Sequence, residues 1–573
     1  MRRARPVAAL AGVAFLIGAI VGANSGPSAA HTLAGHYVAA WARGDYRAMY
    51  LDIDVASRHG ISADEFVAAY GQTTRTATAT SLEVIGKPRD STGGLVSVPV
   101  RVRTRLFGTL ALDVQLRIVS GAEGGPAIAW SPSLAFPGMR PGETLSRQTT
   151  LPRRAPLLAR DGSVLAEGSA TEAGTRSSPL GASASAVIGE VGPIPTARRP
   201  ALEAQGVPSD AVVGSTGLER ALDARLRGTP GGELLAGRRV LATAESHAAS
   251  AVRTTVSPAL QRAAVTALGG QLGGIVAMAP SSGQILAVAG IGLDDLQPPG
   301  STFKMVTLTG VLAAHVANPH TIFPYATHAT LDGVKLSNAN GEECGGSLEL
   351  AFAVSCNSVF APLGVKLGAP RLVATAERFG FNHDPGIEGA AESSLPAASA
   401  IQGELDVGST AIGQGQVQAS ALEMAVVAAS IADGGRRPQP TFTPGPPGTG
   451  TQATSPAVAR TVRRLMIGVV RNGTGTSAAI PGVVVAGKTG TAELKTKSSC
   501  PASSETSSGE SGSESCGPAQ NEASNTDAWF AAFAPALQPR IVVGVLLVQD
   551  GAGGATAAPV ARQVLEAGLA ASH

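Results

Sequence analysis

Two groups of short apolar runs, far apart in the sequence, most constrain the fold. Residues 273–290 read GGIVAMAPSSGQILAVAG, and residues 527–550 contain DAWFAAFAP and RIVVGVLLVQD. Such runs are typical of buried strands, and Pro-Ser-Ser-Gly between the first two predicts a hairpin. Amphipathic helices are expected on either side, at residues 257–268 and 556–571. Because strands need partners, we expect both groups to form one sheet with helices packed on it.

The composition permits large buried cores. Hydrophobic residues make up 44% of the 573 residues, charged residues 15%, and the net charge is +2. Because no basic stripe is interleaved with aromatic residues, nucleic-acid binding is not supported. Residues 496–525 differ, since this Ser-, Gly- and Glu-rich stretch has too few apolar side chains to order itself. We predict a flexible, exposed insertion there.

Changes of pattern divide the rest of the chain. Residues 31–135 combine helical spacing of apolar residues with alternating strands, which predicts a small α+β domain with Trp41 and Tyr46 in its core. In residues 136–255, Gly-rich turns separate short strands and one helix. Residues 256–573 hold the apolar runs described above.

The N-terminus predicts export. Three arginines precede an uncharged run of 18 residues, Pro6 to Ala23. This length is near the short end of what spans a bilayer, and the arginines favour an inside N-terminus. We expect a single-pass anchor in the cell membrane at residues 1–30, with the bulk of the chain outside the cytoplasm. The alternative is a cleaved signal peptide, for which Ser28-Ala29-Ala30 offers a site.

Four cysteines are present, Cys344, Cys356, Cys500 and Cys516. An even number in an exported protein permits disulfides, whereas the spacing matches no metal-ligand pattern. Cys500 and Cys516 flank 15 residues of the insertion, whose ends leave and re-enter strands that we expect to be neighbours. We therefore predict a disulfide at its base. For Cys344 and Cys356, a second disulfide and free thiols both remain open.

A hydroxyl and a lysine stand three residues apart in PGSTFKMVTLTGVLAA. We predict a helix with Ser301 in its first turn and Lys304 on the same face. A serine needs a base to become a nucleophile, and a lysine supplies one when burial or a nearby cation lowers its pKa. The helix N-terminus adds N–H groups for an oxyanion. Taken alone, the pair fits a capped helix with an exposed lysine better.

Two further motifs change that balance. AVSCNSVF places Ser355 two residues before Asn357, and VVVAGKTGTAEL carries a lysine and a glycine directly after an apolar run. The segment VVVAGKTGTAEL is typical of an edge strand, and its glycine would give a bound peptide access to the strand backbone. Its candidate residues are Lys488, Thr489, Gly490 and Thr491. Each motif also has a plain structural interpretation, as a polar pair at a helix turn or as a strand end with a surface lysine.

Ser-x-x-Lys, Ser-x-Asn and Lys-Thr-Gly in this order resemble the active-site motifs of penicillin-binding proteins and serine β-lactamases. PGSTFK, AVSCNSVF, AIGQGQVQASALEMAVVAASIADGG, AGKTGTAE and AWFAAFAP are similar to class B penicillin-binding proteins, the D,D-transpeptidases that cross-link peptidoglycan. RRAPLLARDGSVLA and GSTGLERALDARLRG resemble the family's pedestal, or dimerisation-type, domain. AWSPSLAFPGM and the segment before it resemble the nuclear-transport-factor-like domain of the methicillin-resistance type.

The resemblance implies a multidomain α+β fold. After the anchor come a small cone-like domain (31–135), a pedestal (136–255) and a transpeptidase domain (256–573). The last is expected to have an antiparallel sheet with helices on both faces and an all-helical subdomain. No metal or organic cofactor is implied. The implied partners are peptidoglycan stem peptides, β-lactams and a glycan polymerase.

The resemblance also implies roles for the motif residues. Ser301 attacks the D-Ala-D-Ala carbonyl and is acylated, and Lys304 takes its proton. Ser355 and Asn357 relay protons and hold the substrate amide. An amine from a second stem peptide then attacks the acyl-enzyme, whereas a β-lactam leaves a slow ester on Ser301.

The third motif is implied to bind the substrate. Lys488 and Thr489 face its carboxylate, and backbone N–H groups of Ser301 and Thr491 form the oxyanion hole. Two departures from the family pattern are visible: the segment IGLDDLQP before PGSTFK is short, and Asp527 stands where a histidine is frequent.

Other functions stay open at this point. In a D,D-carboxypeptidase or β-lactamase, water would release the acyl group. Class A β-lactamases use a Glu-x-x-Leu-Asn loop for this, and the string from Glu392, ESSLP, lacks the Asn. A β-lactam sensor or a catalytically silent scaffold is the third possibility.

Overall fold

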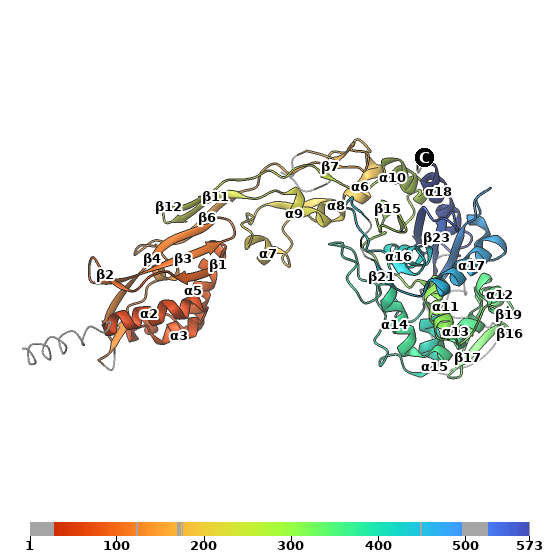
Figure 1. Cartoon of the computed structure of the whole chain (residues 1–573), viewed down its shortest axis with the longest axis horizontal. Coiled ribbons are helices and arrows are strands. Elements are labelled where there is room, and N and C mark those ends of the chain that lie inside the picture. Colours follow the sequence, from red (N-terminus) through yellow and green to blue (C-terminus); the bar gives the residue numbers. More distant parts are fainter. Residues whose placement is uncertain are drawn as a thin grey trace, which may run out of the picture. The chain divides into compact units, whose positions relative to one another are not determined.

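The computed structural model describes residues 28–121, 124–168, 174, 176–446, 448, 450–494 and 525–571. They form two compact units, each assembled from separate stretches of the chain (Figure 1). The first unit takes residues up to 154 together with 193–211 and 227–249, and the second takes the remainder. The segment predicted as a pedestal, 136–255, is thus shared between the units, and its boundaries stay a prediction.

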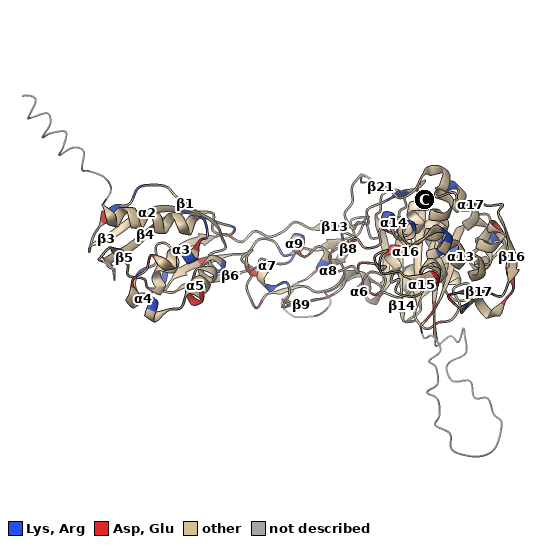
Figure 2. Cartoon of the chain, turned by 90° about the horizontal axis from the view of Figure 1, so that it is seen from below, with Lys and Arg blue, Asp and Glu red and all other residues tan. Residues whose placement is uncertain are grey.

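Several predictions fall outside the described residues. These are the N-terminal anchor, the insertion within 496–525 and the Cys500–Cys516 disulfide. Within the described ranges, no helix is long and apolar enough to cross a membrane. Figure 2 shows that acidic and basic residues are distributed over both units.

In the first unit, helices pack against an antiparallel sheet in the order β1-β3-β4-β5, with β2 paired to β3. The helices are α2 (Ala29–Ala42), α3 (Tyr46–Leu51), α4 (Val55–Gly60) and α5 (Ala63–Thr76). The strands are β1 (Ala79–Val84), β2 (Arg89–Ser91), β3 (Leu95–Thr104), β4 (Thr109–Ser120) and β5 (Pro126–Ile128). Trp41 and Tyr46 pack on the ring of Tyr70 with centroids 4.8 and 5.3 Å away, which agrees with the core role predicted for both.

The first unit also contains a second, three-stranded sheet. Its order is β12-β11-β6, and both pairings are antiparallel. The strands are β6 (Leu145–Thr150), β11 (Gly231–Ala236) and β12 (Arg239–Ala244). A short helix, α7 (Arg199–Glu203), precedes a loop that reaches β6, where the Thr149 hydroxyl donates to the carbonyl of Gly206 across 2.8 Å.

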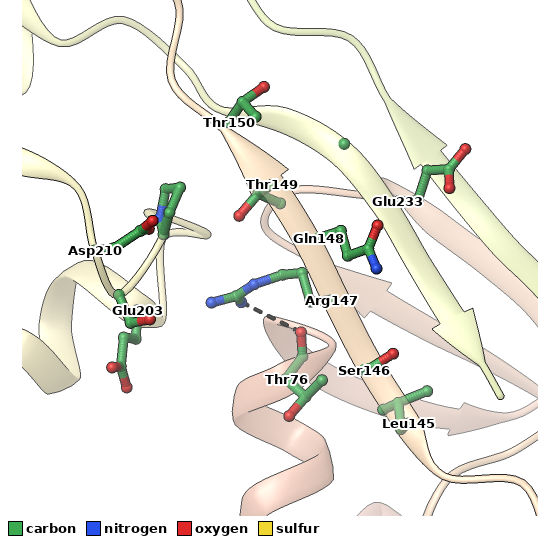
Figure 3. A pocket seen from close by; sticks show the side chains of 13 residues that line it. Thr76, Leu145, Ser146, Arg147, Gln148, Thr149, Thr150, Glu203, Asp210 and Glu233 are labelled. Atoms are coloured by element: carbon green, nitrogen blue, oxygen red, sulfur yellow. Dashed lines mark hydrogen bonds between the residues drawn. The ribbon is translucent and has the colours of Figure 1, made fainter. Parts of the chain in front are cut away.

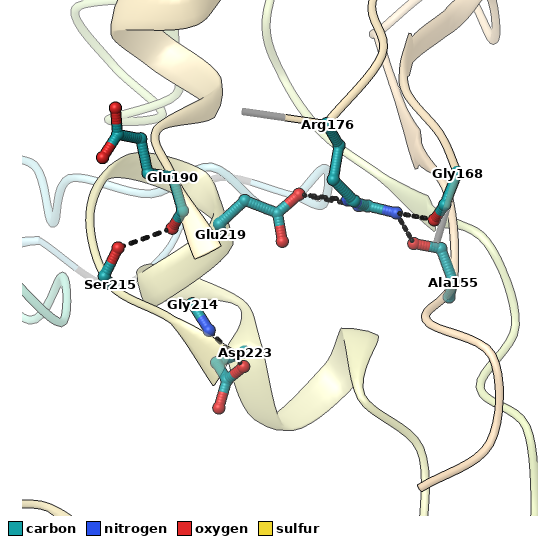
Figure 4. Close-up of polar contacts among 8 residues, drawn as sticks. All are labelled: Ala155, Gly168, Arg176, Glu190, Gly214, Ser215, Glu219 and Asp223. Carbon is teal, nitrogen blue, oxygen red and sulfur yellow. Dashed lines mark hydrogen bonds and ion pairs between the residues drawn. The ribbon is translucent and has the colours of Figure 1, made fainter. Parts of the chain in front are cut away.

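The second unit begins with small elements joined by buried polar contacts. They are β7 (Leu157–Leu158), β8 (Val164–Ala166), α6 (Ala182–Ile188), β9 (Val191–Pro193), β10 (Val212–Gly214), α8 (Gly217–Ala221), α9 (Asp223–Leu226) and β13 (Val252–Arg253). Figure 4 shows Arg176 donating to the Glu219 carboxylate at 2.7 Å and to the carbonyl of Ala155 at 3.0 Å. Both ion-pair side chains are buried, so removing one partner should cost about 3–5 kcal/mol.

The main sheet of the second unit joins both ends of the transpeptidase-like region, as predicted. Its order is β15-β14-β24-β23-β22, and all pairings are antiparallel. The strands are β14 (Gly273–Met278), β15 (Ile285–Gly290), β22 (Ala486–Glu493), β23 (Thr526–Ala534) and β24 (Ile541–Leu547). The predicted terminal helices, α10 (Pro258–Leu268) and α18 (Ala557–Ala570), share one hydrophobic core with this sheet.

Helices also cover the opposite face and build a helical subdomain. On β24, Val543 and Val545 point into the core just described, so Gly544 between them lies on the opposite face of the sheet. There it contacts α16 (Ala421–Ala432). The other helices are α11 (Lys304–Ala313), α12 (Leu348–Ala353), α13 (Asn357–Leu367), α14 (Ala369–Phe379), α15 (Gly403–Ala411) and α17 (Pro456–Asn472). The subdomain is not all-helical as expected, because short two-stranded pairs lie among the helices: β16 (Ile322–Ala326) with β19 (Cys344–Ser347), β17 (His328–Leu331) with β18 (Val334–Ser337), and β20 (Arg436–Arg437) with β21 (Thr451–Gln452).

Candidate active site

The first motif lies in a tight turn at the start of α11. Ser301 belongs to a 3₁₀ turn, η2 (Gly300–Phe303), and Lys304 begins the α-helix proper. The prediction of a helix from Ser301 onward is therefore wrong in its first turn. Gly300 has φ +50°, a left-handed conformation that favours glycine, and its N–H donates to the carbonyl of Gly413 at 2.9 Å. The turn brings Ser301 to the side of strand β22.

The second motif occupies the turn between α12 and α13. Ser355 has φ +62°, which is uncommon for a residue with a side chain. Cys356 forms a disulfide with Cys344 at the start of β19, which answers the question that the sequence left open for this pair. Asn357 donates from Nδ2 to the carbonyl of Ser337 at 2.9 Å, so its Oδ1 is turned toward Lys304.

The third motif lies inside strand β22, which begins at Ala486, so most of the apolar run Val483–Ala486 precedes the strand instead of forming it. β22 is an edge strand, as predicted. A Cβ atom on Gly490 would stand 2.7 Å from the carbonyl oxygen of Pro299 and 2.9 Å from Cβ of Trp529. Glycine at this position therefore lets the turn that carries Ser301 approach the strand.

Lys304 is fully buried and makes two short hydrogen bonds. Its Nζ donates to the carbonyl of Ser355 at 2.7 Å and to Oδ1 of Asn357 at 2.6 Å. Burial lowers the pKa of Lys304 well below its usual value, and the charge of Lys488 lowers it further. A neutral amine has two N–H groups, which these bonds satisfy, so its lone pair is left to accept a proton.

Lys488 is the second buried lysine of the site. Its Nζ donates to Oγ of Ser355 and to the carbonyl of Thr489, both at 2.9 Å. Burial lowers its pKa to about 7. Ser355 Oγ also lies 3.4 Å from Nζ of Lys304, so this one hydroxyl stands between the two amines.

A threonine that the sequence analysis missed completes the strand side of the site. Thr474 follows α17, and its Oγ1 lies 2.6 Å from Oγ1 of Thr489. The backbone N–H of Thr474 donates to the carbonyl of Ala353, just before the second motif. The signal was present as the string NGTGT at residues 472–476, but a surface turn explains it equally well.

Two predicted features stand apart from this cluster. Asp527, on β23, is fully buried, and Oδ1 accepts a hydrogen bond from the N–H of Gln549 at 2.9 Å. Burial, together with the charge of Asp295, raises its pKa to about 6. Glu392 is exposed. In the described part of the chain, no group of His, Cys, Asp and Glu side chains is arranged to hold a metal ion.

The geometry assembles the parts of a nucleophilic serine site. A hydroxyl lies in a turn next to the strand, a buried amine of lowered pKa begins the helix that follows this turn, and a second buried amine lies on the strand. A Cβ on Gly300 would stand 2.6 Å from the carbonyl of Thr491, so the turn and the strand are in direct contact. Such a site can take up an acyl group and stabilise the oxyanion formed on the way.

Three family models match the chain. Residues 273–566 match the penicillin binding protein transpeptidase domain, residues 169–240 the penicillin-binding protein dimerisation domain, and residues 29–143 the NTF2-like N-terminal transpeptidase domain. Among curated proteins, peptidoglycan D,D-transpeptidase PbpA of Mycolicibacterium smegmatis is 32% identical over 425 residues, covering 62% of this chain and 80% of that protein.

Solved structures agree with the sequence relatives. The D,D-transpeptidase domain of a peptidoglycan glycosyltransferase from Eggerthella lenta matches with a TM-score of 0.57 and 30% identity, covering 73% of this chain and 98% of that one. The penicillin G acyl-enzyme complex of penicillin-binding protein A from M. tuberculosis matches with a TM-score of 0.54 and 27% identity, covering 73% and 99%.

Proposed function

Because the chain belongs to the penicillin-binding protein transpeptidase family, we propose that it is a serine-type peptidoglycan D,D-transpeptidase that acts through an acyl-enzyme on Ser301. The observation that carries this proposal is the polar cluster beside Ser301. Ser355 Oγ contacts the amines of both Lys304 and Lys488, from two motifs that are distant in sequence.

Acylation follows from the positions of these groups. Ser301 Oγ attacks the carbonyl carbon between the two terminal D-alanines, and its proton passes to the neutral amine of Lys304. The bond to the last D-alanine breaks, and the leaving nitrogen takes a proton through Ser355. Backbone N–H groups of Ser301 and Thr491 hold the oxyanion during this exchange.

Residues of the edge strand β22 orient the substrate. The protonated amine of Lys488 and the hydroxyl of Thr489 attract the terminal carboxylate of the donor peptide, which lies along β22. Asn357 holds a substrate amide. A primary amine of a second stem peptide then attacks the ester carbonyl, forms the new amide bond and releases Ser301 Oγ. A β-lactam carries a similar carbonyl and carboxylate, acylates the same oxygen and leaves a slowly hydrolysed ester.

A hydrolase is the second candidate. Water in place of the acceptor amine would give a D,D-carboxypeptidase or a β-lactamase from the same acyl-enzyme. The exposed position of Glu392 does not favour it as the activator of that water. The third candidate is a sensor or a silent scaffold. A silent scaffold has no use for the buried lysine contacts at Ser355. A β-lactam sensor would use them but also needs a transmembrane signalling apparatus, which one short apolar run does not favour.

Membrane attachment and a polymerase partner belong to the same proposal. The arginines and apolar run before residue 28 support a membrane anchor. A transpeptidase works on newly made glycan, so we infer that a glycan polymerase supplies its substrate.

Intact-mass measurement with penicillin G tests acylation. The full chain should gain one adduct, and peptide mapping should place it on the peptide that contains Ser301. Ser301→Ala should gain none, with an unchanged melting temperature as the folding control. An adduct that persists in Ser301→Ala would refute the assignment.

A second assay separates the two enzymes. Lipid-linked stem-peptide substrate, with a glycan polymerase added, should yield cross-linked dimers of stem peptides. Release of free D-alanine without dimers would instead establish the carboxypeptidase, and repeated turnover of penicillin G without a lasting adduct would establish the β-lactamase.

A further inference from the structure

The second sheet of the first unit has one unusually open edge. β6 pairs with β11 in an unbroken register, whereas the pairing of β11 with β12 shifts between Leu234 and Leu235. Proteins usually protect sheet edges with bulges, prolines or lysines, because free strand edges pair with other chains. The β6 sequence, LSRQTT, contains no proline or lysine, and its register contains no bulge.

The direction of the free backbone groups on β6 can be derived. The N–H of Gly237 donates to the carbonyl of Thr144 at 2.9 Å, in the register that continues along β11 and β6. Bonded and non-bonded pairs alternate in an antiparallel ladder, so the N–H and C=O groups of Leu145, Arg147 and Thr149 point away from β11. Among the described residues, no backbone partner is found for these outward groups.

A groove of about 650 Å³ lies along this edge and is lined by all six residues of β6 (Figure 3). Figure 3 shows Glu203 and Asp210 on the other side of the groove, on α7 and the loop that follows it. A six-residue strand is about 20 Å long, enough to pair with a short extended peptide. Groove and edge belong to the same compact unit.

The charges around the groove favour a cationic occupant. Glu203, Asp210 and Glu233 contribute three carboxylates. Arg147 reaches from β6 into the groove, where its Nη1 donates to two carbonyls at the end of α5 at 3.2 Å and its charge offsets part of that of Glu203. Arg199 Nη1 lies 3.9 Å from Oε1 of Glu203, but an ion pair between such partly exposed side chains contributes little binding energy. Negative charge therefore exceeds positive charge along the groove.

We propose that the β6 edge binds an extended segment of a partner protein, rich in lysine or arginine, as an added strand. The outward groups of Leu145, Arg147 and Thr149 supply the main-chain bonds, as in other complexes formed by strand addition. The carboxylates select for basic side chains. This inference is independent of the chemistry at Ser301.

The test uses the full chain and a fluorescein-labelled peptide, Thr-Lys-Val-Lys-Thr-Val-Lys. Thr149→Pro removes one outward N–H and places a ring on the free edge, while the ladder to β11 keeps its bonds. Its control, Thr149→Val, retains the N–H and loses the hydroxyl bond to Gly206. Fluorescence anisotropy should show binding to the parent and to Thr149→Val, and at least tenfold weaker binding to Thr149→Pro.

Variants that remove negative charge from the groove give a second, independent test of peptide binding. The double variant Asp210→Asn, Glu233→Gln should weaken binding about fivefold and reduce its salt dependence, and a peptide with glutamate in place of lysine should bind more weakly to the parent. An unchanged melting temperature and far-ultraviolet circular dichroism spectrum in every variant show that the first unit, which holds β6, is still folded. Binding that is absent, or that is equal in Thr149→Pro and parent, overturns the proposal. A dimer of the chain that Thr149→Pro abolishes also overturns it, because the occupant is then a second copy.

Discussion

Lys488 Nζ donates a hydrogen bond to Ser355 Oγ across 2.9 Å, although the two residues stand 133 positions apart. This contact joins the edge strand of the main sheet to the turn between two helices of the helical subdomain. The proposed chemistry needs both sides, since the strand holds the substrate and the turn carries the proton relay. Measurements of acylation therefore report on how well the strand and the turn are aligned with each other.

Lys304→Ala should acylate about 10²–10⁴-fold more slowly than the parent, the usual contribution of a general base. The lysine is buried beside Ser355 and Asn357 and has a lowered pKa, as a base at neutral pH requires. Stopped-flow measurement with a fluorescent penicillin gives the rate. A normal near-ultraviolet circular dichroism spectrum controls for folding, and an unchanged rate would exclude Lys304 as the base.

The pH dependence of acylation should be bell-shaped. As pH rises, Lys304 loses its proton and becomes a base, so the second-order rate constant increases. As pH rises further through about 7, Lys488 becomes neutral and attracts the carboxylate less, so the rate constant declines. The lysines interact, so the two apparent pKa values belong to the pair.

The same shift of Lys488 has a consequence for stability. Its pKa falls from 10.5 to about 7 on folding, so the unfolded chain binds more protons between these values. The free energy of unfolding contributed by this group should therefore increase with pH from about 7 to 10.5. Urea titrations of parent and Lys488→Met at several pH values isolate this contribution, which should vanish in the variant.

Thr474→Val should reduce the acylation efficiency by about 2–10-fold, the range of one ordinary hydrogen bond. The Thr474 hydroxyl lies 2.6 Å from that of Thr489 and fixes the direction of the Thr489 hydroxyl on β22. The loss should appear in substrate binding more than in the limiting acylation rate. Thr474→Ser keeps a hydroxyl and serves as the control, so equal losses in both variants would contradict this role.

The disulfide between Cys344 and Cys356 should stabilise the turn of the second motif. In the chain-entropy model a loop of this size contributes about 3 kcal/mol, and the two cysteines are 12 positions apart. The double variant Cys344→Ser, Cys356→Ser should have a lower urea midpoint and slower acylation. Adding a reductant should move the parent, but not the variant, in the same direction.

The elements that were predicted correctly are those whose local apolar pattern is enough to identify a strand or a helix. The hairpin of β14 and β15, the terminal helices and the joining of β23 and β24 to them follow from apolar runs and the need to pair strands. The three motifs proposed for catalysis were recognised because their residue types and their order resemble the motifs of penicillin-binding proteins. The structure brings these residues together at Ser355.

Other features depend on contacts that no local pattern contains. The 3₁₀ turn at Ser301 forms because Gly300 takes a left-handed conformation against Gly413, more than a hundred residues away. Thr474 belongs to the site because its loop bonds to Ala353 and to Thr489. The division of residues 136–255 between two compact units likewise results from tertiary packing.

Gly490→Ala should impair both stability and acylation. The new methyl group would meet the carbonyl of Pro299 at 2.7 Å and the side chain of Trp529 at 2.9 Å, so the turn that carries Ser301 must move away from β22. Overpacking of this kind typically costs about 1–3 kcal/mol. Gly468→Ala, in helix α17 where nothing lies within 4 Å of the added atom, is the matched control and should be neutral or slightly stabilising. Thermal unfolding and penicillin acylation are measured for both variants. A Gly490→Ala protein that acylates at the parent rate would show that acylation does not require close contact between the turn and the strand.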